Sequence, residues 1–300
     1  MTAVSPSTSE SASTSSTGRA RARAGRRRRG SWWLSALAIA AFTVVFLIPF
    51  AFIVLTALKD PRQASELSFT WPAHLQIVQN FKAVLETQDY LLIIAFINST
   101  ILTVGSVTIM VILGSMVAFV LQRRASRWNG PINFLVLSGL IIPPAVVPTI
   151  WVLQSLHLFK TLGGLIMIEV AFGLPFCILL FRAFISTIPR ALDEAAIIDG
   201  AGPLRLFFRV IFPLLRPVVV TVIVVQSVVV FNDFTNPLYF LPGEQNATVQ
   251  LTLFNFQSQF TTAYNLLFMD ILLITIPPLV MFLFFNRKIV AGLTSGAIKG

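Results

Sequence analysis

The sequence is poor in the residues that a soluble protein needs on its surface. Of its 300 residues, only 11% are charged, whereas 56% are hydrophobic. An average soluble domain carries about 25% charged residues, and its surface needs polar cover. The shortage of charge therefore argues against an ordinary soluble domain and predicts an integral membrane protein.

Residues that carry out common enzyme chemistry are scarce as well. The one cysteine, Cys177, excludes a disulfide framework and a cysteine zinc cluster. The two histidines, His74 and His157, disfavour a histidine metal site or a Ser-His-Asp centre. The sequence also lacks a GxxxxGKS/T phosphate-binding loop. We therefore predict a chain that is not an enzyme and binds no metal or cofactor of its own.

Much of the net charge of +10 lies near the N-terminus, where seven arginines fall between Arg19 and Arg29 behind a Ser/Thr-rich stretch. This segment has almost nothing apolar to bury, so residues 1–30 are predicted to form a disordered cytoplasmic tail. A basic run could bind nucleic acid instead. Because a long apolar run follows at once, we favour membrane lipid as its partner, and no nucleic acid.

Long apolar runs follow the tail, and a helix needs roughly 20 apolar residues to cross the hydrocarbon. The first run exceeds the about 7–15 residues of a signal peptide, which disfavours cleavage. Prolines 143, 144 and 148 predict a kinked or interrupted third helix. Residues 31–287 would form the membrane domain, and residues 288–300 a cytoplasmic tail. The six predicted spans are Trp32–Leu58, Tyr90–Gln122, Asn133–Leu156, Leu162–Phe181, Ile211–Asn236 and Leu266–Asn286.

The orientation of these spans follows from the distribution of lysine and arginine. With the N-terminus inside, 18 of the 22 basic residues fall on the cytoplasmic side and four outside. Cytoplasmic loops carry an excess of Lys and Arg. We therefore predict a multi-pass protein of the cell (inner, cytoplasmic) membrane with both termini in the cytoplasm.

The predicted inside loop Arg182–Val210 is long and charged. Pro189 can open a helix, and Asp193 and Glu194 suit its first turn, near the positive end of the helix dipole. Gly200 would end the helix as a C-terminal cap. The loop predicts a short helix that meets a partner, although an ordinary amphipathic helix at the membrane surface is the alternative.

Two sets of motifs stand out in this loop and around it. The first set, in the loop and at the start of the next span, is Glu194-Ala195-Ala196, Asp199-Gly200-Ala201, Ile211, Pro213, Leu214 and Pro217. It resembles the EAA signature of ABC-importer permeases. The second set, elsewhere in the chain, is Asn80-Phe81, Asn98-Ser99, Phe231-Asn232-Asp233-Phe234 and the ending from Gly292 to Gly300. It resembles the carbohydrate branch of those permeases.

This resemblance implies an all-α, six-helix permease subunit of a maltose-type (type I) ABC importer, with its transmembrane core at about residues 90–286 and its EAA loop at residues 182–217. It implies four kinds of contact: a second homologous permease, two ATPase subunits, an extracytoplasmic sugar-binding protein and lipid. It further implies that the ATPase is coupled through Asp193, Glu194, Ala195, Ala196, Asp199 and Gly200. The C-terminal ATPase contact would comprise Gly292, Gly296 and Lys299.

Acidic and amide residues within the spans are candidates for the translocation path, because charge in hydrocarbon is costly. We assign Glu169, Asp233 and Asn232 to this path. Glu169 could instead be protonated or paired across an interface, and helix–helix hydrogen bonding is the alternative for Asn232. Asp233 and Asp270 fall near the outer ends of predicted spans, where we expect water to reach them. No second acid or histidine is expected beside Glu169, which disfavours a proton relay.

Two other functions compete with a sugar importer. An ABC permease for a non-sugar solute would share the EAA loop but not the C-terminal motif. An ion-coupled secondary carrier would transport alone and would show inverted repeats, which the sequence does not display. We therefore predict an ATP-driven sugar importer subunit, without naming the sugar.

Overall fold

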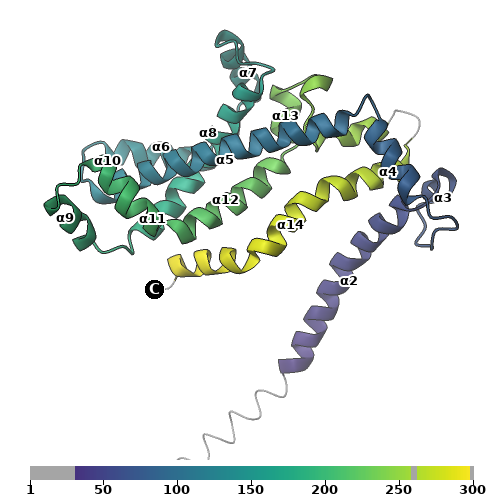
Figure 1. The fold of residues 1–300 in the computed structure, drawn as a ribbon, viewed down its shortest axis with the longest axis horizontal. Coiled ribbons are helices and arrows are strands. Elements are labelled where there is room, and N and C mark those ends of the chain that lie inside the picture. Colours follow the sequence, from purple (N-terminus) through teal and green to yellow (C-terminus); the bar gives the residue numbers. More distant parts are fainter. Residues whose placement is uncertain (1–30, 258–261, 298–300) are drawn as a thin grey trace, which may run out of the picture. The chain divides into compact units, whose positions relative to one another are not determined.

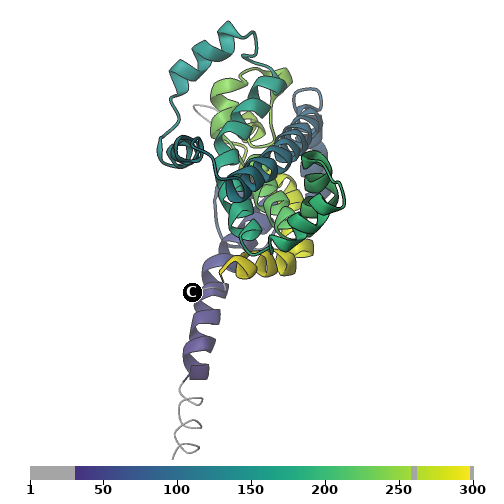
Figure 2. The same ribbon diagram turned by 90° about the vertical axis from the view of Figure 1, so that its left-hand side faces the viewer.

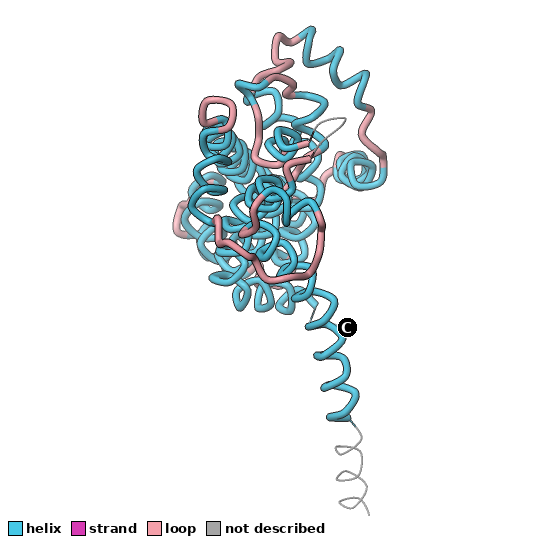
Figure 3. Tube along the Cα trace, turned by 90° about the vertical axis from the view of Figure 1, so that its right-hand side faces the viewer, coloured by secondary structure: helices cyan, strands magenta, loops and turns pink. Residues whose placement is uncertain are grey.

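The computed structural model describes residues 31–257 and 262–297. The predicted tail of residues 1–30 lies outside the described residues. The chain divides into two units, residues 1–52 and 53–300. The described residues form helices and no strand (Figure 3), apart from an isolated bridge between Gln257 and Thr262. The predicted all-α class is confirmed.

Helix α2 (Ser31–Ala57) begins in the first unit and ends in the second. It is apolar on every side, as expected for a helix that crosses a membrane. Its Pro49 lies inside the helix, which is tolerated in membrane spans.

The remaining helices belong to the second unit (Figure 1), in which α5 packs along α8, and α12 packs against both α5 and α14. Their bounds are α3 (Pro61–Ser65), α4 (Ile77–Glu86), α5 (Leu91–Arg123), α6 (Asn129–Ile141), α7 (Val146–Ser155), α8 (Leu162–Ile185), α9 (Ala191–Ile198), α10 (Pro203–Leu206), the π-helix η1 (Phe207–Ile211), α11 (Phe212–Leu214), α12 (Arg216–Phe231), α13 (Thr235–Phe240), the 3-10 helices η2 (Glu244–Asn246) and η3 (Leu251–Phe256), and α14 (Tyr264–Ala297).

The main core lies where α5 meets α8, around side chains such as Leu102, Met110 and Phe181. The two helices approach closely at Gly114, where an added Cβ would lie 3.1 Å from the Cβ of Cys177. A second core cluster joins α4, the start of α5 and the first half of α14. These two clusters fix α5 along its whole length.

Four described helices are long and apolar enough to cross a membrane, and six spans result only if each of two bent helix pairs counts as one. The predicted third span, Asn133–Leu156, breaks between α6 and α7 with a bend of 117°. Its expected interruption is confirmed, because Pro143 and Pro144 lie in the break. A single continuous helix over that run does not form.

The predicted fifth span, Ile211–Asn236, contains a bend that was not predicted. Residues 203–214 form a separate segment that is bent by 76° from α12, so the straight helix begins at Arg216 and not at Ile211. Pro217 suits the first turn of the new helix because it needs no hydrogen-bonded N–H there. The helix ends at Phe231, before the predicted end at Asn236.

Candidate functional site

Helix α9 forms at the predicted position within the loop that we expect on the cytoplasmic side. Its first turn carries Asp193 and Glu194, whose charges favour the N-terminal end of a helix. Gly200 follows in the left-handed conformation with φ +80°. The N–H of Ala201 bonds back to the carbonyl of Ala196 at 2.9 Å. The predicted glycine cap is confirmed, and it sets the direction in which the chain leaves α9.

The two faces of α9 differ in exposure. Asp193 is buried, and Ala196 packs against the main core. Glu194, Ala195 and Ile197 are exposed, and Ile198 is 85% exposed. Helix α9 lies at one end of the second unit, in the dark green group at the front of Figure 2. The helix therefore presents an apolar face with one carboxylate.

Asp193 is held inside the subunit by Arg123, the last residue of α5. The Nε atom of Arg123 lies 2.8 Å from Oδ2 of Asp193, and the two side chains are only 11% and 13% exposed. The Nη2 atom of Arg123 donates to the carbonyl of Ile188 at 2.8 Å. The carboxylate of Asp193 therefore points into the subunit and is not part of the exposed face of α9 that carries Glu194. Arg123 was not predicted as a site residue, although its place at the end of a predicted span was a signal.

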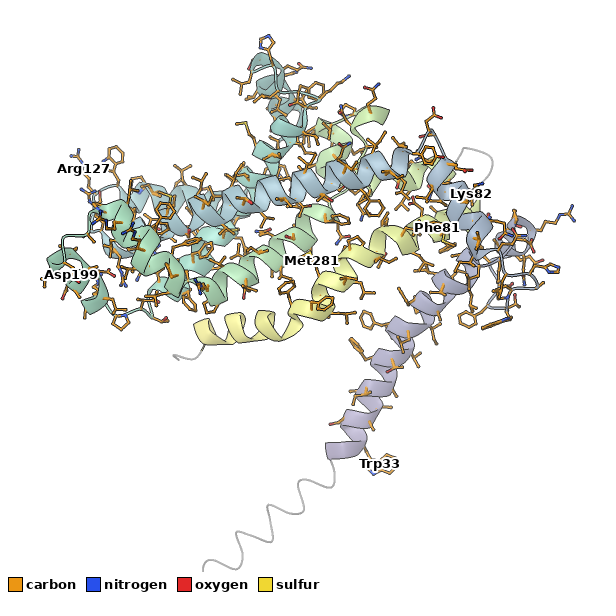
Figure 4. All side chains as sticks on the ribbon, viewed as in Figure 1. Trp33, Phe81, Lys82, Arg127, Asp199 and Met281 are labelled. Atoms are coloured by element: carbon orange, nitrogen blue, oxygen red, sulfur yellow. The ribbon has the colours of Figure 1, made fainter. Side chains whose placement is uncertain are left out.

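A second arginine ties the same ends of the helices together. Arg182, in the last turn of α8, donates to Oε1 of Gln122 at 3.2 Å and to Oδ1 of Asn133 at 2.5 Å. Arg127 and Asp199 lie at this end of the second unit in Figure 4, and Lys82, which we expect outside, lies at the other. Charges predicted on one side of the membrane thus gather at one end.

A cavity of about 430 Å³ lies among α5, α8 and α12, and the start of α13. Asn236 donates to Oε1 of Glu169 at 3.1 Å, and Asp233 lies within interacting distance of the Glu169 carboxyl group. The absence of a second acid near Glu169, which we expected, is therefore wrong. The polar groups facing the cavity are Glu169, Gln226, Asp233 and Asn236, and its apolar lining includes Met110, Phe172 and Phe176.

The turn after α12 explains how these residues meet. Oδ1 of Asp233 accepts hydrogen bonds from the backbone N–H groups of Thr235, at 2.8 Å, and Asn236, at 3.4 Å. These bonds reverse the chain and start α13, which packs against α8. Asn236 is thereby brought to Glu169, from which it is 67 residues distant in sequence.

Residues 110–294 match the family described as the inner membrane component of binding-protein-dependent transport systems. This chain belongs to that family. The resemblance found in the EAA region is confirmed at the family level, and the chain is a multi-pass transport subunit and not an enzyme.

Curated relatives of the permease align over most of its length. The melibiose/raffinose/stachyose import permease protein MelC of Bacillus subtilis is 33% identical over 270 residues, which are 89% of this chain and 96% of MelC. The diacetylchitobiose uptake system permease protein NgcG of Streptomyces coelicolor is 28% identical over 89% of this chain and 88% of NgcG.

A solved structure has the same fold as the permease. A chain of a bacterial ABC transporter involved in the import of the acidic polysaccharide alginate matches with a TM-score of 0.76 at 19% identity. The match covers 87% of this chain and 97% of that one. The predicted type I importer fold is thereby confirmed.

The other predicted site residues of the permease lie apart from the cavity. Asn232 is exposed and bonds to the carbonyl of Val228 and to Gln250, and it does not line the cavity. Gln226, which we did not assign, does line it. Its signal was a lone amide within an apolar run.

Asp270 differs from its prediction. It is fully buried, so the expected access of water at this position is wrong. Thr252 of η3 donates to its Oδ2 at 2.8 Å, and Oδ1 has no partner among the described residues. The segment that contains η3, which we expect on the outer side, packs against α14 and provides this cover.

The predicted C-terminal contact is described only in part. Gly292 and Gly296 belong to α14, which continues to Ala297. Lys299 lies outside the described residues.

Proposed function

We propose that this permease is one subunit of an ATP-driven sugar importer. It works with a second permease, two ATPase subunits that bind ATP and Mg, and an extracytoplasmic sugar-binding protein. The observation that carries the proposal is the 33% identity to MelC over nearly the full length of both chains. MelC imports oligosaccharides, and NgcG takes up diacetylchitobiose, so we infer that an oligosaccharide is the substrate.

In this proposal α9 is the coupling helix that docks on the ATPase at the cytoplasmic face. Ile197 and Ile198 expose apolar surface there, and such a patch favours a protein partner. Glu194 would form a charge-assisted pair with a cation of the ATPase. The small side chain of Ala195 would permit the ATPase to approach closely. Asp193 would not contact the ATPase but would hold α9 in place through its ion pair with Arg123. Gly292, Gly296 and Lys299 would supply a second contact.

The cavity beside Glu169 would form part of the translocation path. Its volume falls within the range of about 300–1,000 Å³ typical of ligand pockets. Carboxylates and amides hydrogen-bond sugar hydroxyls, and the rings of Phe172 and Phe176 suit the apolar faces of a sugar. A proton relay would use the same acids, and uptake driven by an ion gradient distinguishes it from ATP-driven transport.

Reconstituted complexes test the proposal. The permease and its partners are placed in liposomes that contain ATP, and uptake of radiolabelled raffinose is measured with the binding protein outside. We expect uptake that requires ATP and the binding protein, and no uptake by the permease alone under a proton or sodium gradient. Uptake driven by a gradient without the ATPase would contradict the proposal. A binding protein that loads phosphate and no sugar would contradict the substrate class.

A further inference from the structure

The buried ion pair between Arg123 and Asp193 joins the exposed loop helix α9 to α5, a helix of 33 residues that runs through the core. We propose that Arg123 is a positioning residue that clamps α9 to α5, so that a displacement of α9 by its partner moves α5 with it. This inference rests on the proposed coupling role of α9. It assigns a task to two residues that make no contact with the ATPase or the sugar in the account above.

Arg123 contacts the chain both just before α9 and within the first turn of α9. Its Nη2 atom binds the carbonyl of Ile188, before α9 begins, and its Nε atom pairs with Asp193, in the first turn of α9. A guanidinium presents its N–H groups in a rigid planar fork. One side chain therefore reaches both segments: its Nη2 atom hydrogen-bonds Ile188, and its Nε atom forms an ion pair with Asp193, although the Nε–H makes no hydrogen bond among the described residues.

Burial makes this pair more than a surface contact. Exposed ion pairs contribute little, whereas removing one partner of a buried pair leaves an uncompensated charge. At 11% and 13% exposure, both side chains are shielded from solvent. Apart from Ala196, the remaining residues of α9 are exposed, so few other contacts of α9 could replace the pair.

Helix α5 is suited to carry the displacement across the membrane. Its 33 residues span about 50 Å at about 1.5 Å per residue. Near the opposite end, Asn98 donates to the carbonyl of Ala247 at 3.1 Å, and Ser99 accepts from the N–H of Val249 at 3.0 Å. One rigid element thus connects the loop helix α9 with the segment around η2 that we expect on the outer side.

Charge reversal tests the clamp in the assembled complex. Arg123→Asp, Asp193→Arg and the double exchange are compared with Arg124→Asp, which makes the same charge change at the exposed neighbouring residue. The measurement is ATP hydrolysis with and without the sugar-loaded binding protein. We expect each single reversal to lower the stimulated rate by about tenfold or more, with basal hydrolysis retained, and the double exchange to restore most of the stimulation. Arg124→Asp should behave as the unaltered chain does.

Three outcomes would overturn the proposal: full stimulation in both single variants, an equal loss in Arg124→Asp, or no recovery in the double exchange. If a reversal prevents assembly, Arg123→Gln and Asp193→Asn remove the charge at nearly constant size and decide the question by the same measurement. Arg123→Lys should give intermediate stimulation. If the unaltered complex itself shows no stimulation by the binding protein, the proposed function fails and not the clamp.

Discussion

At the scale of single residues, Glu169 and Asp233 are the two acidic side chains that line the cavity. Glu169 is only 4% exposed and is held by Asn236. Asp233 uses one oxygen to start α13. The two carboxyl groups therefore lie close together in the lining of one cavity, where, in the proposed path, they would hydrogen-bond the hydroxyl groups of a sugar.

Glu169→Gln should slow sugar uptake several-fold while the binding protein still stimulates ATP hydrolysis. The glutamine keeps an oxygen that can accept from Asn236, so the fold is preserved while the acid is lost. Uptake per ATP hydrolysed is the measurement. Glu66→Gln, at an exposed position on the predicted outer side, is the control, and unchanged uptake in Glu169→Gln would remove this residue from the path.

The pairings of these residues could not be predicted from sequence. Glu169 was singled out because an acid in an apolar run is costly. Its partner Asn236 follows a turn of the chain, and that turn begins only after α12 ends at Phe231. The periodicity of an apolar run does not reveal where such a run stops being helical, and the predicted span was therefore extended through Asn236.

At the scale of elements, α9 and its glycine turn were predictable because they are local. Proline, acids and glycine act within one or two turns of helix, and the structure places them as expected. The bend of 76° before α12 was not predicted. It depends on how residues 203–214 pack into the core, to which Leu206, Phe207 and Ile211 contribute, and local sequence does not contain that information.

Gly200→Val should abolish uptake while the permease still reaches the membrane. Gly200 has φ +80° in open space, so the strain of a β-branched residue there is conformational and not steric crowding. The left-handed conformation costs a residue with a side chain about 1–2 kcal/mol. Membrane content by immunoblot and uptake in cells are the measurements.

Gly202→Val is the matched control for that substitution. Gly202 also lies in open space, but it has φ −69° and ψ 165°, which valine adopts readily. Uptake should remain near the original level. Equal loss in both variants would show that the conformation of Gly200 is not what matters.

Asn98→Ala should loosen the outer segment from α5. Asn98 donates to the carbonyls of Gln245 and Ala247, and leaving such groups without a partner costs about 1–3 kcal/mol. The detergent-solubilised permease should unfold at a lower temperature and be cut faster near residue 246 by protease. Thr100→Ala, which loses only a bond to its own helix, should change neither measurement, and equal behaviour of the two variants would argue against the attachment.

At the scale of the whole molecule, the distribution of charge predicts which end faces the cytoplasm. Among exposed serines, Ser126 lies beside the arginines at the end of α5, and Ser65 lies in the segment before α4. A cysteine at Ser126 should be protected from an impermeant thiol reagent in intact cells, whereas one at Ser65 should react. The native Cys177 is fully buried and gives little background. The reverse labelling pattern would refute the predicted orientation.

The fold class was predictable because membrane helices satisfy their backbone groups internally, which makes long apolar runs a strong signal. Two of the six predicted spans are exceptions. Breaks near prolines divide each of them into a pair of bent helices. Composition therefore identified these segments as apolar but did not predict that they would bend.

We propose that the exposed face of α9 couples this permease to an ATPase. The stimulation of ATP hydrolysis by the binding protein shows whether it does. ATP hydrolysis by the purified complex is recorded with and without the sugar-loaded binding protein, for the unaltered chain and for Glu194→Ala. The substitution removes one side of a charge-assisted contact of about 1.5–3 kcal/mol, so stimulation should fall by about tenfold while the complex remains assembled. Full stimulation in Glu194→Ala would contradict the claim that α9 is the coupling element.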